Sequence, residues 1–505
     1  MRLTRTQFLG LSAAAAGTVS LSGCAALVQR YATPEVPDRV GEADADPVVW
    51  RVLNRAMFGP RPGDVERVAG VGVDAFIEEQ LAPERIPEDW ASSLRVGTLD
   101  TLEMDAEDAR DWEMSNFPEV GKGQAAVELQ QACLIRAVYS ARQLQEVMMD
   151  FWSDHFNVSQ LKADCSWLKT VDDRLLRKHA MGKFRDLVSA SAHSPAMLFY
   201  LDNDKNRRRD AGGDGPNENY ARELLELHTL GVNGGYSLKD VQEIARCFSG
   251  WGFKKGLTWK PGDFEFRAGQ HDDGSKHVLG TLIPGGQGVR DGEQVIDLVC
   301  HHPSTARYLA RKLCRRFVAD RPDPKLVARV AGVFERTDGD IRQVLSALLH
   351  SEEFKHGGAP KLKRPVEYAV SAMRAVNANS SCAGVLPHLE RMGQLPYKWT
   401  MPDGYPERPE AWAPGLLARW NFVVELVQGR LAGTSVPLDR LARATRAAEP
   451  LPVLQGLSRA VLGKAITETG IRSLVGEHMP KAFPKTEELQ AWTALLLASP
   501  GFQYR

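Results

Sequence analysis

Residues 217–231 read NENYARELLELHTLG, and this stretch decides how the rest of the chain is interpreted. Pro216 and Asn217 are residue types that begin helices and Gly231 is one that ends them, so the stretch is predicted to be a single helix. At about 100° per residue, its polar side chains gather on one arc and its apolar side chains on the opposite arc. The polar arc holds Glu218, Asn219, Arg222, Glu223, Glu226 and Thr229, and the apolar arc holds Tyr220, Ala221, Leu224, Leu225, Leu227 and His228.

The polar arc of this helix has two interpretations. Glu218 with Arg222, and Arg222 with Glu226, have the i,i+4 spacing of surface ion pairs, each worth about 0.2–0.5 kcal/mol. A charged arc of this kind is usually a solvated face. Carboxylates, a guanidinium and an amide on one side of a helix can also form the wall of a functional site. His228 lies in the centre of the apolar arc, so we expect it to be a packed histidine.

Helical periodicity recurs along most of the chain, in segments such as 63–82, 124–157, 166–190 and 303–319. Alternating strand patterns are scarce, and aromatic residues between 250 and 283 indicate one short hairpin. No repeat period indicates a solenoid. The predicted fold class is therefore all-α: a large multi-helix body with long irregular loops and at most a small β-hairpin.

The composition is that of a soluble globular protein. The chain has 505 residues, of which 43% are hydrophobic and 25% charged, a length that allows more than one packing unit. The formal net charge is -1, which provides no large positive field to gather phosphates. We therefore expect no nucleic-acid partner.

The N-terminus resembles a lipoprotein signal. Arg2 and Arg5 precede an apolar, alanine-rich run over residues 8–21, and Leu-Ser-Gly leads into Cys24. The run is too short to span a bilayer permanently. We expect residues 1–23 to be a signal peptide and Cys24 to carry the lipid that anchors the protein to a membrane; the alternative is a simple secretory signal with an incidental cysteine. Either places the protein outside the cytoplasm, in the periplasm or at the cell surface.

The rest of the chain divides into two parts. Residues 24–46 contain Pro34, Pro37 and several acidic residues with little apolar periodicity, so they are predicted to be a flexible tether. Residues 47–505 are predicted to form a single helical body. Apart from Cys24, the six cysteines have long, irregular spacings that allow either three disulfides or buried free thiols: Cys133, Cys165, Cys247, Cys300, Cys314 and Cys382.

Two irregular segments have compositions that are unusual for plain linkers. Residues 203–216 form a polar loop that leads into the 217–231 helix, and residues 394–415 contain several prolines and aromatic residues. Loops of this length in a compact body are usually functional or mobile. The aromatic side chains of the second loop are expected either to form a platform for sugar rings or to pack the loop onto the helices: Tyr397, Trp399, Tyr405 and Trp412.

Several motifs occur in a fixed order between residues 54 and 280, and the resemblance that they carry covers about residues 48–500. They are Asn54–Pro62 (NRAMFGPRP), Phe151–Phe156 (FWSDHF), the 217–231 helix, Gly235-Tyr236, Ala245–Trp251 (ARCFSGW), and His271-Asp272 with Lys276 and Gly280. Together they resemble the bacterial domain-of-unknown-function 1800 family. Ser153-Asp154 departs from the His-Asn commoner in that family, which argues against a ligand at position 153. The resemblance implies an exported protein, often encoded beside an exported sulfatase-like protein, and it supplies no reaction.

The chemistry expected first is glycoside hydrolysis by a pair of carboxylates, one protonated and one ionised, with no cofactor. Arg222 would keep one carboxylate ionised, and burial would raise the pKa of another. An exported enzyme with aromatic loops suits a polysaccharide substrate. The candidate catalytic residues are Glu218, Glu223, Glu226, Asp272, His155 and His271, and the candidate substrate-binding residues are Asn219, Arg222, Lys276, Trp152, Trp251, Trp399 and Tyr405.

Two other functions stay open. A metal-dependent hydrolase or oxidoreductase would bind a divalent metal through His155, Glu223, Glu226 and His271, a mixed nitrogen and oxygen set that suits zinc, manganese or iron. A non-enzymatic scaffold would use the polar helix arc to bind an exopolysaccharide or a partner protein. The chain has no HExxH, GxSxG, phosphate-loop or Rossmann glycine motif. Whether the protein is an enzyme is thus left open, with the hydrolase favoured.

Overall fold

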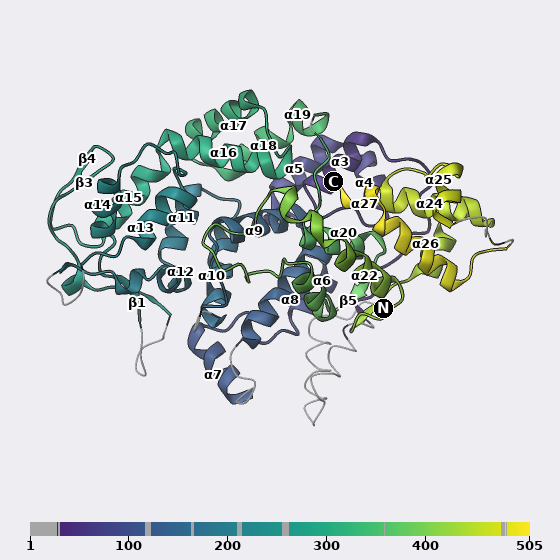
Figure 1. The fold of residues 1–505 in the computed structure, drawn as a ribbon, viewed down its shortest axis with the longest axis horizontal. Helices are drawn as coiled ribbons and strands as arrows, with labels where there is room; N and C mark the ends of the chain where they lie inside the picture. The colour runs from purple at the N-terminus through teal and green to yellow at the C-terminus, as the bar shows by residue number, and fades with distance from the viewer. Residues whose placement is uncertain are drawn as a thin grey trace.

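The computed structural model describes residues 28, 31–116, 123–162, 166–209, 215–254, 262–357, 359–475, 480 and 482–505 (Figure 1). The predicted signal peptide, Cys24 and Cys165 lie outside these residues. The first part of the body is helical throughout. Its helices are α3 (Pro47–Arg55), α4 (Asp64–Val71), α5 (Val73–Leu81), α6 (Trp90–Val96), α7 (Ala106–Asn116), α8 (Gln124–Tyr139), α9 (Gln143–His155) and α10 (Ser166–His179).

The middle of the chain combines helices with two small hairpins. The helices are α11 (Phe184–Ala192), α12 (Pro195–Tyr200), α13 (Asn219–Glu223), the π-helix η4 (Leu224–His228), α14 (Leu238–Cys247), α15 (Arg290–Cys300), α16 (Pro303–Phe317), α17 (Pro324–Arg336), α18 (Ile341–Leu349) and α19 (Glu352–Lys355). The strands pair antiparallel, β1 (Trp251–Phe253) with β2 (Phe264–Phe266) and β3 (Lys276–Val278) with β4 (Thr281–Ile283).

The last part returns to helices. These are α20 (Pro365–Ala375), α21 (Leu386–Arg391), α22 (Leu416–Val427), α23 (Leu438–Ala444), α24 (Pro450–Leu462), α25 (Glu468–Val475), α26 (Thr486–Ala498) and α27 (Pro500–Gln503), with a two-residue strand pair of β5 (Asn379–Ser380) and β6 (Thr434–Ser435). The all-α prediction is confirmed, and both hairpins of the middle part fall inside the predicted 250–283 region. In Figure 1, α8, α9 and α10 lie near the middle, α13 to α15 towards one end and α24 to α26 towards the other.

Local chemistry explains where helices begin and end. The Asp46 side chain accepts hydrogen bonds from the amides of Val48 and Val49 at the start of α3. The predicted 124–157 helix is two helices, because the chain leaves the helical conformation at Ser140. The Gln143 amide donates to the carbonyls of Ala137 and Ser140, so it satisfies groups that the break exposes.

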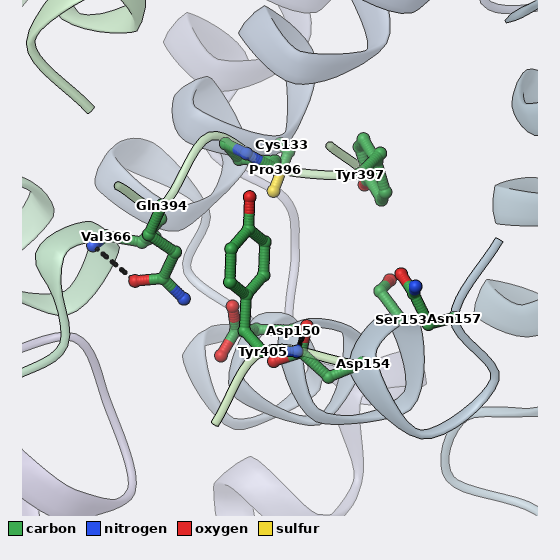
Figure 2. A pocket seen from close by; sticks show the side chains of 10 residues that line it. All are labelled: Cys133, Asp150, Ser153, Asp154, Asn157, Val366, Gln394, Pro396, Tyr397 and Tyr405. Atoms are coloured by element: carbon green, nitrogen blue, oxygen red, sulfur yellow. Dashed lines mark hydrogen bonds between the residues drawn. The ribbon is translucent and has the colours of Figure 1, made fainter. Parts of the chain in front are cut away.

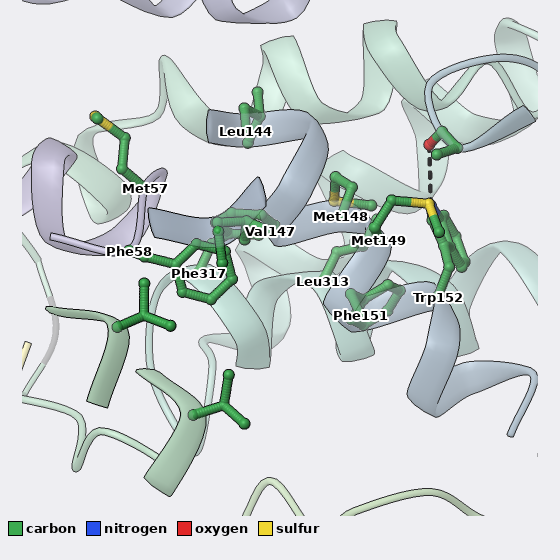
Figure 3. Close-up of a cluster of buried hydrophobic side chains, with 14 of the residues drawn as sticks. Met57, Phe58, Leu144, Val147, Met148, Met149, Phe151, Trp152, Leu313 and Phe317 are labelled. Atoms are coloured by element: carbon green, nitrogen blue, oxygen red, sulfur yellow. Dashed lines mark hydrogen bonds between the residues drawn. The ribbon is translucent and has the colours of Figure 1, made fainter. Parts of the chain in front are cut away.

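The core is built around α9, whose apolar side chains pack against α16 (Figure 3). Trp152 of α9 is 1% exposed, and its indole nitrogen donates to the carbonyl of Ala180 at 2.9 Å. Figure 3 shows Trp152 beside Met149 and Phe151, with Leu313 of α16 nearby. Trp152 is thus a core residue rather than the substrate-binding residue expected from the sequence, because its whole side chain is removed from solvent.

Residues 31–46 pack against the body rather than forming a free tether. Ala32 is fully buried, and its carbonyl accepts a hydrogen bond from the Arg95 guanidinium at 2.6 Å. The Val40 amide donates to the carbonyl of Ala444 at 3.0 Å. The proline-rich composition that predicted a flexible segment over 24–46 also suits an extended strap whose backbone groups bond to the helices, which is what the described part of it is.

Five cysteines of the described residues are free thiols. Cys247, Cys300, Cys314 and Cys382 are buried, and Cys133 is partly buried. Of the two alternatives that the spacings allowed, these five follow the buried-thiol one. Over the residues that the structure describes, no helix has both the length and the apolar character needed to cross a membrane.

Candidate functional site

The helix predicted over 217–231 changes its winding in the middle. It is an α-helix only over Asn219–Glu223, and Leu224–His228 is a π-helix. A π-turn has more residues than an α-turn, so positions after Glu223 leave the faces that 100° spacing assigns to them. Thr229, expected on the polar arc, is fully buried, and its hydroxyl donates to the carbonyl of Leu224. Short π-helices are frequent at functional sites because they redirect side chains.

Both predicted ion pairs on the polar arc are present. An Arg222 guanidinium nitrogen lies 3.0 Å from Glu218 and another lies 3.8 Å from Glu226. The three side chains are between 29% and 41% exposed, so solvent screens the pairs and their contribution to stability is about a few tenths of a kcal/mol. Their contribution to folding is therefore small.

Glu223 differs from its neighbours because it is partly withdrawn from solvent. Burial raises the pKa of its carboxyl above the usual 4.5, and the carboxylates of Glu226 and Asp403 raise it further, against the opposing Arg222. Tyr236 forms a side-chain hydrogen bond with Glu226, and burial raises the pKa of that phenol to about 12. The helix thus presents a carboxyl with a raised pKa beside a second carboxyl group.

His155 connects α9 to the π-helix. Its Nε2 lies 2.9 Å from the carbonyl oxygen of His228, and its Nδ1 lies 2.9 Å from the Lys312 ammonium. Because a carbonyl only accepts and an ammonium only donates, Nε2 carries the proton and Nδ1 accepts. Burial, with Lys312 nearby, holds the pKa of His155 well below 6.5. His155 is therefore a neutral residue that positions the helix end, and it does not face solvent as a general acid or base.

Lys312 was not recognised from the sequence as a site residue. Burial lowers the pKa of its ammonium from 10.5 to about 8, against the carboxylates of Glu407 and Asp154 and the more weakly interacting Asp403. The Nζ atom also lies 5.6 Å from the centre of the Tyr308 ring. Only its place on a helix predicted over 303–319 was visible in the sequence, because nothing near it in the chain marks it as functional. It brings a positive charge next to His155, which in turn contacts the end of the π-helix.

The 394–415 loop lies across the C-terminal end of α9. The Asn157 amide donates to the carbonyls of Trp399 and Met401, at 3.1 and 2.6 Å. Gly404 has a φ of 73°, and a Cβ atom there would lie 2.1 Å from the carbonyl oxygen of Asp154, so the contact requires glycine. The loop thereby holds Asp403 close enough to Glu223 to raise its pKa.

The aromatic side chains of this loop mostly pack against one another. The rings of Trp399 and Tyr405 are 5.1 Å apart, and those of Tyr405 and Trp412 are 6.0 Å apart. Tyr405 is 9% exposed, and its hydroxyl donates to the carbonyl of Leu395. Tyr405 therefore supports the loop and does not offer its ring to a substrate, contrary to expectation. Trp399 is partly exposed, and its indole nitrogen donates to Asp403 at 2.8 Å, so it remains a candidate contact.

A small cavity of about 20 Å³ lies beneath the loop (Figure 2). That volume holds about one water molecule, so it is not a substrate pocket. Figure 2 shows the Tyr405 ring rising between Gln394 and Tyr397, with Asp150 and Asp154 at its foot. Burial raises the pKa of Asp154 to about 6 although the Arg364 guanidinium, 2.7 Å away, opposes the shift.

His271, Asp272 and Lys276 form a separate, structural network. His271 has Nδ1 2.8 Å from the carbonyl oxygen of Ser249 and Nε2 3.0 Å from the carboxylate of Asp291 on α15. Lys276, fully buried, pairs with the same carboxylate. These bonds attach the β3–β4 hairpin to α14 and α15.

Asp272 completes this network on the α14 side. Arg246 binds its two carboxylate oxygens at 2.9 and 3.0 Å, and this guanidinium lowers the pKa of Asp272. The polar groups of the candidate residues His271, Asp272 and Lys276 are thus bonded to Ser249, Asp291 and Arg246. Among the candidate segments that the structure describes, His155 is the one bonded to the 217–231 stretch, through the His228 carbonyl.

The residues expected to bind a metal do not come together as a ligand set in the described part of the chain. Within the described ranges, no three histidine, cysteine, aspartate or glutamate side chains converge as a metal site requires. Both ring nitrogens of His155 and of His271 already face protein partners, so neither is free to join Glu223 and Glu226. Trp251, another expected substrate contact, is 1% exposed and packs between the rings of Phe248 and Phe264.

Comparison with known proteins identifies the family to which the chain belongs. The family model described as "Protein of unknown function (DUF1800)" matches residues 51–504, nearly the whole chain. No curated protein and no solved structure matches the chain. The motifs that carried the resemblance, including the 217–231 helix and the Trp152-to-Phe156 element, all fall within the matched residues. The chain therefore belongs to the DUF1800 family.

Proposed function

We propose that this protein is a hydrolase that cleaves a carbohydrate polymer by acid–base catalysis between the Glu223 helix face and the 394–415 loop. The observation that carries the proposal is the raised pKa of Glu223, to which burial contributes most, the neighbouring Glu226 next, and Asp403 on the loop least. Glycoside hydrolysis needs one protonated and one ionised carboxyl group on opposite sides of the bond. Two carboxyl groups on different elements meet that need better than two on one helical turn.

In this mechanism Glu223 is the general acid. Its partial burial raises its pKa, which suits it to hold a proton and donate it to the oxygen of the leaving sugar. Asp403, which accepts a hydrogen bond from the Trp399 indole, is the ionised counterpart that activates water or stabilises the developing positive charge on the sugar ring. The carbon–oxygen bond breaks, water supplies a hydroxyl to the sugar carbon and a proton returns to the carboxylates.

The neighbouring groups have supporting parts. Arg222 and Tyr236 hold Glu226 beside the acid, and the partly exposed Trp399 offers an aromatic face of the kind on which sugar rings stack. Asn219 is exposed on the same helix and suits a hydroxyl contact. Export is proposed from residues 1–23 and lipid anchoring from Cys24. A surface polysaccharide would then be within reach, and an exported sulfatase-like protein is the proposed neighbour.

Binding without turnover is the second candidate. The Arg222, Glu218 and Glu226 side chains are about a third exposed and already paired, which suits recognition by a shallow polar face. The two functions differ in what Glu223 must do. In a binding scaffold, the Glu223 side chain has to supply only its shape and hydrogen bonds. In a hydrolase, it has to donate a proton.

The test is release of reducing ends from pectin, alginate, xylan, chitosan and dextran by the purified protein and three variants. We expect Glu223→Gln and Asp403→Asn each to lower turnover by at least about a hundredfold. Glu335→Gln is the matched control, because it changes an exposed carboxylate on α17 in the same way, and it should retain turnover. Activity that survives in Glu223→Gln would reject the acid role. Polymer binding without reducing ends in any protein would favour the scaffold.

A further inference from the structure

A second hollow, of about 450 Å³, lies between α10, α11 and the start of β2. Pockets that hold small molecules usually range from about 300 to 1,000 Å³, so this one has room for a small ligand. Its lining comes from α10, α11, the start of α12 and residues 262–264. None of these belongs to α13, the π-helix or the 394–415 loop, so the hollow is distinct from the proposed catalytic face.

His193 forms one side of this hollow and is held rigidly. Its ring centre lies 4.6 Å from that of Trp251 and 4.4 Å from that of Phe264. Nδ1 is 2.8 Å from the carbonyl oxygen of Ser189, and Nε2 is 3.2 Å from the carboxylate of Glu293. The two ring nitrogens thus face the Ser189 carbonyl and the Glu293 carboxylate. The histidine therefore presents a fixed edge to the hollow.

The arginine of the lining is paired as well. The Arg185 guanidinium lies 2.8 Å from Glu293 and 2.8 Å from Asp297, both on α15. The lining adds the carboxylates of Asp186 and Asp263. The carboxylates of Asp186, Asp263, Glu293 and Asp297 thus outnumber the Arg185 guanidinium at and just behind the lining, so an anionic ligand would meet net repulsion.

The two kinds of surface in the hollow define its ligand. Phe264, Val171 and Leu175 provide an apolar side. Elsewhere in the lining, Arg185 and Ser189 can donate hydrogen bonds, and Asp186 and Asp263 can accept them. A pyranose ring has the matching build, with C–H bonds on one face that stack on an aromatic ring and hydroxyls around its rim that bond to paired charges. We propose that this hollow binds a single neutral sugar residue, free or at a chain end. The proposal does not depend on hydrolysis at Glu223.

The test uses the folded full chain with three probes: D-glucose, N-acetyl-D-glucosamine and D-glucuronate. Saturation-transfer NMR detects contact, and titration calorimetry measures affinity. We expect at least one of the two neutral sugars to bind and glucuronate to bind more weakly than that sugar. Phe264→Ala should weaken binding by about tenfold, because it removes the stacking surface. Leu282→Ala, at a 54% exposed position on β4, is the matched control and should bind as the unchanged protein does.

A second variant covers the case in which Phe264→Ala fails to fold. Asp186 is exposed at the rim, so Asp186→Ala should keep the fold and weaken binding by several-fold. Glu223→Gln should bind the sugar unchanged, which separates this proposal from the catalytic one. Three results would overturn it: no binding of either neutral sugar, glucuronate as the tightest ligand, or full affinity in both Phe264→Ala and Asp186→Ala.

Discussion

The Lys312 ammonium donates a hydrogen bond to Nδ1 of His155 at 2.9 Å, while Nε2 of the same ring donates to the carbonyl of His228. This relationship joins three elements: α16, α9 and the end of the π-helix. It requires a neutral imidazole with its proton on Nε2. The position of the Glu223 helix thus depends on a buried, uncharged histidine that never touches substrate.

Lys312 makes the stability of the protein depend on pH in the alkaline range. Its pKa is about 8 when folded and 10.5 when unfolded, so the unfolded chain binds more protons between these values. This lysine should therefore make the free energy of unfolding increase as pH rises from about 8 to 10.5. Lys312→Met should remove that gain.

Chemical denaturation at several pH values between 8 and 10.5 measures this effect. Burial also lowers the pKa of Lys363, to about 7, so this lysine changes stability with pH in the same direction. Because Lys363 is present in both the unchanged protein and Lys312→Met, the difference between their curves reports on Lys312. Parallel curves for the two proteins would contradict the assignment.

The two buried histidines, His155 and His228, should make the stability of the protein depend on pH in the acid range. Burial holds the pKa of His155 well below 6.5 and lowers that of His228 to about 3, so only the unfolded chain takes up these protons as pH falls below about 6.5. Each should lower the free energy of unfolding by up to about 1.4 kcal/mol per pH unit. Urea unfolding at pH 7, 6 and 5 should show a shallower decline in His228→Phe than in the unchanged protein. An equal decline in both would mean that His228 is protonated in the folded state.

Trp152 should matter for stability rather than for substrate. Trp152→Ala removes a fully buried indole and should lower the free energy of unfolding by about 3–5 kcal/mol. Trp420, which is 45% exposed, is the matched control, and Trp420→Ala should change stability by less than about 1 kcal/mol. Equilibrium denaturation distinguishes them. A stable Trp152→Ala protein would return this residue to the list of candidate substrate contacts.

The Lys276 and Asp291 pair should be structural. Lys276→Met leaves a fully buried carboxylate without its lysine, which should cost about 3–5 kcal/mol. Arg39→Met breaks a pair whose side chains are 68% and 52% exposed and should change stability little. Thermal unfolding of both variants measures the contrast. If Lys276→Met kept its stability and lost only turnover, the 271–276 segment would belong to the catalytic site after all.

Gly404 should be required for the position of the loop. In Gly404→Ala, the new Cβ would collide with the backbone of Asp154 and the residue would keep a left-handed φ, so the loop must move away from α9. We expect faster proteolysis within 394–415 and loss of turnover, with the rest of the fold intact. Gly393→Ala, where φ is also positive but no atom lies within 4 Å, controls for backbone strain alone.

Much of the fold could be predicted from the sequence because apolar periodicity reports directly on burial. It identified the all-α class and both ion pairs of Arg222. It could not predict the π-helix at Leu224–His228, since that winding depends on tertiary contacts such as the bond from His155 to the His228 carbonyl. It also placed Thr229 on the wrong face for the same reason.

The candidate site was predicted in part. Glu223 and Glu226 of the proposed site could be selected from the sequence because a helix arc of carboxylates is visible within one stretch. Asp403 was missed because it lies far from Glu223 in the sequence, and only the folded chain brings the two groups near each other. Lys312 was missed because it lies within an ordinary amphipathic helix. His271 and Lys276 were expected there because polar motifs carry no information about which partner satisfies them.

The central claim is that the Glu223 helix and the Asp403 loop form one electrostatically coupled site. Carbon-13 NMR titration of the glutamate carboxyls, with Glu223→Gln to assign the signal, measures the pKa of Glu223 directly. The account predicts a value above 4.5 that falls in Asp403→Asn, because one of the charges that raises it is removed. An ordinary value, or one that Asp403→Asn leaves unchanged, would contradict the claim.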